Sequence, residues 1–173
     1  MAHGKHLKLL QAGAPAPDFR LQHLGGGEVT LRELVAKGPA LLAFFKVNCP
    51  VCQMTFPFLE RLQTPGRLPV YGISQNCVED TVSFNRHFGI TFPMLLDPEG
   101  SGFPASNAYG ISSVPTLFLV EQDGTIAEVT EGWRKSEIER LGARSGVNPF
   151  RPTDSVPEAK SSSSASGWRA RRW

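Results

Sequence analysis

The sequence predicts an α/β fold with a central mixed β-sheet flanked by helices, and three observations predict it. Apolar runs of strand length alternate with stretches of helical spacing along residues 19–109. The turn signal Asp123-Gly124 then joins two further strand-like runs. A last stretch of helical spacing follows that hairpin. Alternation of strands and helices favours parallel pairing and a hairpin adds antiparallel pairing, so we expect both in one sheet.

The elements of the first half follow from local patterns. Gly38-Pro39 ends a helical turn, and the nearly continuous apolar run after it is typical of a strand covered on both faces. Apolar residues at 54, 58 and 62 then repeat with helical spacing. We therefore expect strands at 19–21, 28–31, 40–47 and 69–74, and helices at 32–37, 51–62 and 79–88.

The second half is predicted in the same way. A short apolar run ends at a turn that begins at Asp97, and a brief helix ends at Gly110. The hairpin strands follow, and Ile138 and Leu141 give the closing helix an apolar face. We expect strands at 92–96, 115–120 and 125–130, and helices at 105–109 and 135–144.

Composition limits the class of protein. The 173 residues suit a single domain, and 40% hydrophobic with 20% charged residues favour a globular chain over a disordered one. A net charge of +2 argues against a dedicated nucleic-acid binder. The longest apolar run, residues 39–45, is far shorter than the ~18–20 residues of a membrane span. The N-terminus shows no secretory signal, so we expect a cytoplasmic protein.

Domain boundaries follow changes in composition. Residues 1–13 are predicted to be a leader segment and residues 14–147 the folded domain. Residues 148–173 hold three prolines and four consecutive serines but few aliphatic residues, which predicts a disordered tail. With five Lys or Arg against two Asp or Glu, that tail carries a net charge of +3.

The most informative motif is Cys49-Pro50-Val51-Cys52, at the junction of a buried strand and a helix. Pro50 suits the first helical position, which makes Cys49 the residue that caps the helix. Free amides and the helix dipole there stabilise a thiolate and lower the pKa of a thiol. Cys49 is therefore predicted to be the exposed, attacking sulfur, and Cys52 the shielded sulfur that resolves the mixed disulfide.

Two other interpretations of the motif stay open. The pair would be half of a zinc site if Cys77 and either His87 or His23 completed it, although no second paired cluster is present. The cysteines would alternatively be inert core residues. We favour redox chemistry and expect no metal.

Three further sequence elements carry a family resemblance. Pro57 stands five residues after Cys52, where thioredoxins have a helix-kinking proline. Residues 89–100 contain an F-P-x-L-x-D-P-x-G pattern, and residues 109–120 contain Tyr-Gly followed by Val114-Pro115-Thr116. From about residue 17 to 141 the chain resembles the thioredoxin-like superfamily. It is most similar to the branch shared by the alkyl hydroperoxide reductase/thiol-specific antioxidant (AhpC/TSA, redoxin) group and TlpA/ResA-like oxidoreductases.

The resemblance implies a function and further site residues. It implies a thiol–disulfide oxidoreductase that exchanges electrons with a protein or small-molecule thiol or disulfide, without a cofactor and as a monomer. It implies a cis bond before Pro115, which leaves the backbone of Val114 beside Cys49 to pair with an extended partner chain. Pro50, Val114 and Pro115 are thus the expected substrate-binding residues.

The sequence also departs from the family pattern. Asn48 replaces the common tryptophan before the first cysteine, and Ala43 replaces the buried acid that many thioredoxins have. Lys46 and Glu60 are poor substitutes for that acid as a proton relay. Lys46 also stands three residues before Cys49, where peroxiredoxins carry Thr or Ser, so peroxide reduction is expected to be slow.

Two rival functions remain from the sequence. One is a thiol-dependent peroxidase that uses the same cysteines. The other is a non-enzymatic binding module in which a disulfide between the cysteines is structural. Cys77 is expected on a loop at the end of the sheet that holds Cys49, either as a regulatory or extra resolving thiol or as a solitary cysteine without a role.

Overall fold

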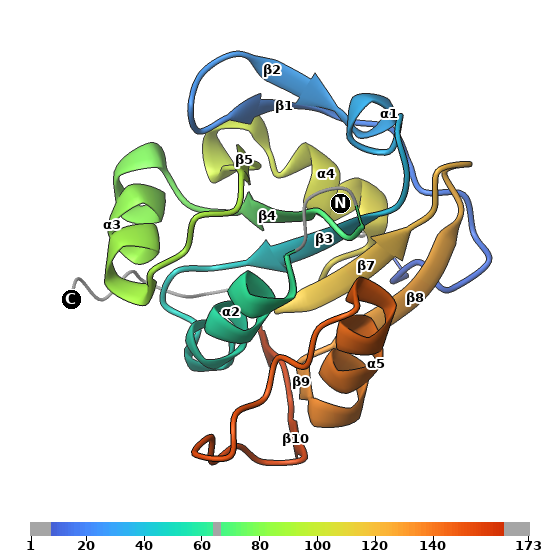
Figure 1. The fold of residues 1–173 in the computed structure, drawn as a ribbon. Coiled ribbons are helices and arrows are strands. Elements are labelled where there is room, and N and C mark those ends of the chain that lie inside the picture. The colour runs from blue at the N-terminus through green and yellow to red at the C-terminus, as the bar shows by residue number, and fades with distance from the viewer. Residues whose placement is uncertain (1–7, 64–66, 165–173) are drawn as a thin grey trace.

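The computed structural model describes residues 8–63 and 67–164 and contains the predicted mixed sheet (Figure 1). Seven strands lie in the order β2-β1-β5-β4-β3-β7-β8. Strands β3, β4 and β5 are parallel, and the remaining neighbours are antiparallel. The strands are β1 Arg20–His23, β2 Glu28–Thr30, β3 Ala40–Phe45, β4 Val70–Ser74, β5 Met94–Leu96, β7 Thr116–Val120 and β8 Ile126–Glu131.

Helices cover both faces of this sheet. They are α1 Leu31–Leu34, α2 Pro50–Leu62, α3 Val78–Phe88, α4 Pro104–Tyr109 and α5 Lys135–Ser145, with a 3-10 turn η1 at Glu99–Ser101. Apolar residues of α2, α3 and α5 share one buried cluster, and those of α1 and α4 share another. Each predicted helix is present among the described residues, with ends that move by no more than three residues.

Strand β3 lies between the two clusters. All six of its residues are buried, as its continuous apolar run predicts. Phe45 packs against Phe56 of α2, with ring centroids 4.3 Å apart, and Phe44 packs against Tyr109 of α4 at 5.3 Å. Successive side chains of a strand point to opposite faces, so one strand anchors both helical layers. This packing fixes the position of the start of α2.

The ends of three strands define the edge of the sheet at which α2 begins. The parallel strands β3 and β4 run toward this edge, and α2 follows β3 there. Thr116, the first residue of β7, pairs with Phe44 near the end of β3. The segment before β7 therefore reaches the same edge from the opposite direction.

The prediction of a disordered tail is wrong for residues 148–164. Strand β10 (Ala159–Lys160) pairs with β9 (Trp133–Arg134), and β11 (Ser163–Ser164) pairs with β6 (Ser113–Val114). Phe150 packs on Phe58 at 5.2 Å and on Trp133 at 6.2 Å. Low aliphatic content predicts disorder only when a segment lacks a partner surface, and here the domain supplies one. Residues 165–173 lie outside the described residues.

The segment 8–13 of the predicted leader also packs on the domain. Leu9 and Leu10 lie against the cluster that contains α4, and Leu10 N–H donates to Tyr109 O at 3.2 Å. The remainder of the leader, residues 1–7, lies outside the described residues. Within the part of the chain that is described, no helix is both long and apolar enough to cross a bilayer.

Candidate active site

Cys49 caps the N-terminus of α2. Its backbone is extended, and its Sγ accepts the N–H of Cys52 at 3.1 Å. Pro50 takes the first helical position, where no N–H is needed, and its side chain is exposed. The sequence prediction of the helix start is confirmed. The local fold thus directs a helix N-terminus at one sulfur.

The loop before Cys49 is fixed by side chains from two neighbouring elements. Val47 N–H donates to Asn76 Oδ1 at 3.0 Å, and Gln53 Nε2 donates to Val47 O at 2.9 Å. Asn76 follows β4, and Gln53 belongs to the first turn of α2. The loop is therefore tied to both the sheet and the helix, which holds the sulfur of Cys49 at a defined place.

The two thiols have pKa values that move in opposite directions. The pKa of Cys49 is lowered from 9.0 to about 7, first by a hydrogen bond from the Cys52 thiol, against an opposing effect of burial. Backbone N–H groups of Cys52 and Val51 and the side chain of Ser163 lower it further. The pKa of Cys52 is raised by its complete burial and by the neighbouring Cys49. At neutral pH, Cys49 is thus the sulfur that ionises first.

Val114 and Pro115 lie beside this pair. The peptide bond between them is cis, as the family resemblance implies. The Cys49 thiol donates to Val114 O at 3.5 Å, a long contact of the kind that sulfur makes. The structure therefore brings four of the predicted site residues together: Cys49, Cys52, Val114 and Pro115. Pro50 is next to them in the chain.

One predicted feature of Cys49 is wrong. The sequence predicts an exposed sulfur, but the residue is only 1% exposed. Cys49 is part of the buried cluster that includes Val114, and the C-terminal segment reaches the same place, because Ser163 of β11 pairs with Val114. Composition concealed this contact because the serine run suggests a solvated tail. The apolar residues Phe150 and Val156, which pack on the core, are the signal that a docked segment was present.

Cys77 stands apart from this group. It precedes α3, makes no side-chain capping bond and is exposed. It lines a surface hollow together with Asn76, Leu96 and Pro98, whereas neither Cys49 nor Cys52 lines that hollow. A regulatory or resolving role for Cys77 stays a prediction. Among the residues that the structure describes, no cluster of three or more His, Cys, Asp or Glu side chains is placed to hold a metal, so the zinc interpretation lacks a ligand set there.

None of the three positions considered for a proton relay, Ala43, Glu60 and Lys46, places a free carboxylate beside Cys52. Ala43 is buried within β3 and carries no acid, as the sequence shows. The carboxylate of Glu60 accepts the backbone N–H groups of Thr91 and Phe92 at 3.0 and 3.3 Å, so it fixes a loop. Burial lowers the pKa of Lys46, and Glu99 opposes that shift. A dedicated acid beside Cys52 is therefore missing from the positions at which the family would place one.

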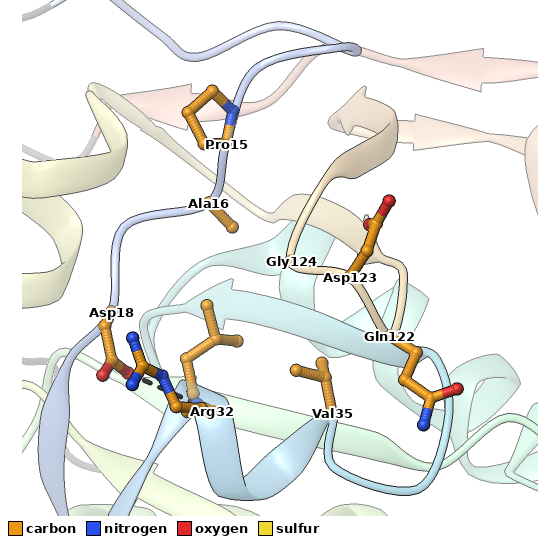
Figure 2. A pocket seen from close by; sticks show the side chains of 9 residues that line it. Pro15, Ala16, Asp18, Arg32, Val35, Gln122, Asp123 and Gly124 are labelled. Carbon is orange, nitrogen blue, oxygen red and sulfur yellow. Dashed lines mark hydrogen bonds between the residues drawn. The ribbon is translucent and has the colours of Figure 1, made fainter.

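A second hollow lies far from the cysteines. Figure 2 shows it between residues 15–18, α1 and the turn at 122–124. Arg32 N–H donates to Asp18 Oδ1 at 3.3 Å at its edge. Val120, just before that turn, pairs with Ala40 at the start of β3. The hollow therefore lies at the end of β3 opposite to Cys49, and no cysteine lines it.

Comparison with known proteins identifies the family. The model of the AhpC/TSA family matches residues 12–129, which is more than half of the chain. The chain belongs to the AhpC/TSA family. The resemblance predicted from the cysteine motif and the elements at 89–100 and 109–120 is confirmed.

Relatives within and around this family place it in the thioredoxin-like branch. The chain is 34% identical over 128 residues to the thiol–disulfide oxidoreductase ResA of Halalkalibacterium halodurans, covering 72% of this chain and 70% of ResA. It is 31% identical over 138 residues to ResA of Geobacillus kaustophilus, covering 74% of each chain.

A solved structure agrees with this family assignment at the level of the fold. The thioredoxin domain of a thiol–disulfide oxidoreductase from Bacteroides vulgatus has a TM-score of 0.70 and 21% identity, covering 80% of this chain and 99% of that domain. The predicted thioredoxin-like fold and the prediction of an oxidoreductase are confirmed.

Proposed function

We propose that this protein is a dithiol–disulfide exchange enzyme in which Cys49 attacks and Cys52 resolves. The observation that carries the proposal is the capped sulfur of Cys49, which accepts Cys52 N–H at 3.1 Å and has a pKa of about 7. A thiolate is the nucleophile of disulfide exchange, and one with a pKa near ambient pH combines ionisation with nucleophilicity. The names of the ResA relatives support the same class of reaction.

The first step forms a mixed disulfide. The Cys49 thiolate attacks one sulfur of a disulfide in a partner protein, a new S–S bond forms, and the partner's S–S bond breaks. The partner's other sulfur leaves as a thiolate and takes up a proton. Val114, whose backbone lies beside Cys49, is proposed to pair with the partner chain as an added strand.

The second step releases the partner. Cys52, deprotonated, attacks the Cys49 sulfur, and the mixed disulfide breaks to give a second thiol on the partner. The enzyme ends with a Cys49–Cys52 disulfide, so two electrons have moved from the enzyme to the partner. Run in reverse, the same two steps oxidise a partner dithiol.

The pKa values of the two thiols favour this order of events. While Cys49 is a thiolate, its charge helps to hold the pKa of Cys52 up. When Cys49 enters the mixed disulfide, that charge is gone and Cys52 ionises more readily. Cys52 is thus kept from reacting until a partner is attached.

The test is a Cys52→Ser protein incubated with an excess of an unfolded, disulfide-bonded polypeptide. A mixed disulfide on Cys49, identified by mass spectrometry of the digested protein, is the expected result. A Cys49→Ser protein is the matched control and should give no stable adduct at position 52. Absence of an adduct on Cys49 with every disulfide tried would refute the proposal.

A further inference from the structure

The C-terminal segment reaches the candidate active site along a defined path. Trp133 Nε1 donates to Pro157 O at 2.6 Å, and Lys135 N–H donates to Glu158 O at 2.9 Å. Strand β10 then pairs with β9. The chain passes over Gly132, where a Cβ atom would overlap the carbonyl oxygen of Lys160. Close packing thus delivers residues 161–164 to the edge of the sheet that holds Cys49.

At that edge, the segment takes the form of an added strand. Ser163 pairs antiparallel with Val114, and Ser164 pairs with Ser113. Ser162 Oγ donates to Ser113 Oγ at 2.7 Å. Backbone pairing of this kind is how an extended polypeptide adds itself to a sheet edge. The chain paired at this edge is thus extended, and its side chains are small.

Ser163 is the residue of this added strand that lies opposite Val114. Val114 is the residue whose carbonyl accepts the Cys49 thiol at 3.5 Å. The Ser163 side chain is also one of the groups that lower the pKa of Cys49. Cysteine differs from serine only by sulfur in place of oxygen. A cysteine at this point of an extended chain would place its sulfur against Cys49.

We propose that residues 159–164 are an internal stand-in for the disulfide-bearing polypeptide on which this enzyme acts, with Ser163 in the place of the reacting cysteine. The segment covers Cys49 and must leave before a protein partner reacts. The partner segment it represents is extended, runs antiparallel to Ser113–Val114 and carries small residues beside its cysteine. This inference rests on the proposed function of Cys49.

The register is tested by cross-linking in the full chain. Ser163→Cys is introduced with Cys52→Ser and Cys77→Ser, so that only two thiols remain. Diamide is the oxidant: it takes up two electrons and two protons to become the hydrazine, as Cys49 and the new thiol lose them and form a disulfide. We expect near-complete cross-linking, read by mass spectrometry of the digested protein.

The matched control moves the new cysteine by one residue, to Ser164→Cys in the same background. Neighbouring side chains of a strand point to opposite faces, so this thiol should cross-link at least tenfold more slowly. Equal rates at the two positions, or no cross-link at position 163, would overturn the proposed register.

Displacement is tested by hydrogen exchange on the full chain with Cys52→Ser and Cys77→Ser. The peptide Ala-Lys-Ser-Ser-Cys-Ser, activated as a mixed disulfide with 2-thiopyridine, is attached to Cys49, and pyridine-2-thione leaves. Before attachment, amides of residues 159–164 should be protected from exchange; after attachment, that protection should be lost while β3 and β4 keep theirs.

The outcomes separate the two proposals. If the peptide never attaches to Cys49, and other disulfides also fail, the proposed function fails. If it attaches while residues 159–164 stay protected, the enzyme chemistry stands and the stand-in does not. Exchange of residues 159–164 at the rate of an unstructured chain before attachment would likewise overturn the stand-in.

Discussion

The backbone N–H of Cys52 donates to the sulfur of Cys49, so the second cysteine stabilises the thiolate of the first before it ever reacts with it. The Cys52 thiol is also the largest cause of the lowered pKa of Cys49. In the proposed mechanism, one residue thus prepares the nucleophile and later resolves the mixed disulfide. The ionisation of Cys49 is the property on which the proposed chemistry depends.

The first prediction concerns that ionisation. The thiolate absorbance that is present in the protein and absent from a Cys49→Ser variant should rise with pH and reach half its maximum near pH 7. Free cysteine reaches that point near pH ~8.5. A midpoint above pH 8 would contradict the capped-thiolate account.

The same shift has a consequence for stability. The pKa of Cys49 is lower in the fold than its ordinary value of 9.0, so ionisation stabilises the fold fully above about pH 9. That contribution is lost as the pH falls from 9 to 7. Denaturant titrations of the reduced protein and of Cys49→Ser should therefore diverge as the pH rises through this window.

The second prediction separates the thiol of Cys52 from its backbone. In Cys52→Ala the side-chain hydrogen bond to Cys49 is gone while the backbone N–H remains, so the pKa of Cys49 should rise toward that of a free thiol. In Cys52→Ser a hydroxyl replaces the thiol as donor, and the pKa should rise less. The thiolate absorbance titration measures both, and an equal shift in the two variants would contradict the assigned cause.

The third prediction concerns Gly132, which has a φ of +71° and lies against Lys160 O. Gly132→Ala should destabilise the protein by more than the ~1 kcal/mol that positive φ alone costs, because the added Cβ pushes the C-terminal segment away. It should also increase the rate at which iodoacetamide modifies Cys49 at pH 9.

Gly124 supplies the control for this variant. Its φ is +85°, but a Cβ atom there would meet no atom within 4 Å. Gly124→Ala should show only the backbone cost and leave the modification rate of Cys49 unchanged. Equal effects of the two substitutions on Cys49 would contradict the position assigned to the segment.

The fourth prediction tests Glu60 as a loop anchor. Its carboxylate accepts two backbone N–H groups and the Thr91 hydroxyl. Glu60→Gln removes the charge and weakens these bonds, so the free energy of unfolding should fall by about 1 kcal/mol. The titration of Cys49 should stay the same, whereas a shifted midpoint would give Glu60 the relay role that its contacts argue against.

The fifth prediction concerns Asp97, the buried carboxylate at the start of α4. It accepts the backbone N–H groups of Ala105 and Ser106 at 2.9 and 2.8 Å. Asp97→Asn puts an N–H₂ group among donors and should lower the free energy of unfolding by about 2–3 kcal/mol. Asp123→Asn, on an exposed turn, is the control and should have a smaller effect in the same denaturant titration.

Local patterns predicted most of the fold. The apolar run of β3 needs cover on both faces, and Pro50 marks the first turn of α2, so sequence alone located the strand, the helix and the capping cysteine. The mixed sheet followed from the hairpin at Asp123-Gly124. These features depend on residues that are close together in the chain.

The parts that sequence missed depend on contacts between distant residues. The pairing of Ser163 with Val114 joins residues 49 positions apart, and nothing in a run of serines indicates a partner strand. The burial of Cys49 likewise involves residues that are distant in the chain, such as Val114, so local patterns could not predict it. The contact of Phe150 with Trp133 could not be predicted for the same reason, because it forms only on the surface of the folded domain.

Because Ser163 belongs to the same chain as Cys49, a separate substrate must compete with an attached segment for the place beside Cys49. Lys160 is fixed by β10, only three residues before Ser163, so the segment faces Cys49 at an effective concentration on the order of millimolar or higher. A substrate in solution at micromolar concentration must make additional contacts with the protein to displace a segment held at that effective concentration. Glutathione-sized disulfides offer little backbone for this exchange, whereas a long unfolded polypeptide can replace the whole strand. The proposed role of residues 159–164 therefore predicts a preference for polypeptide substrates over small disulfides.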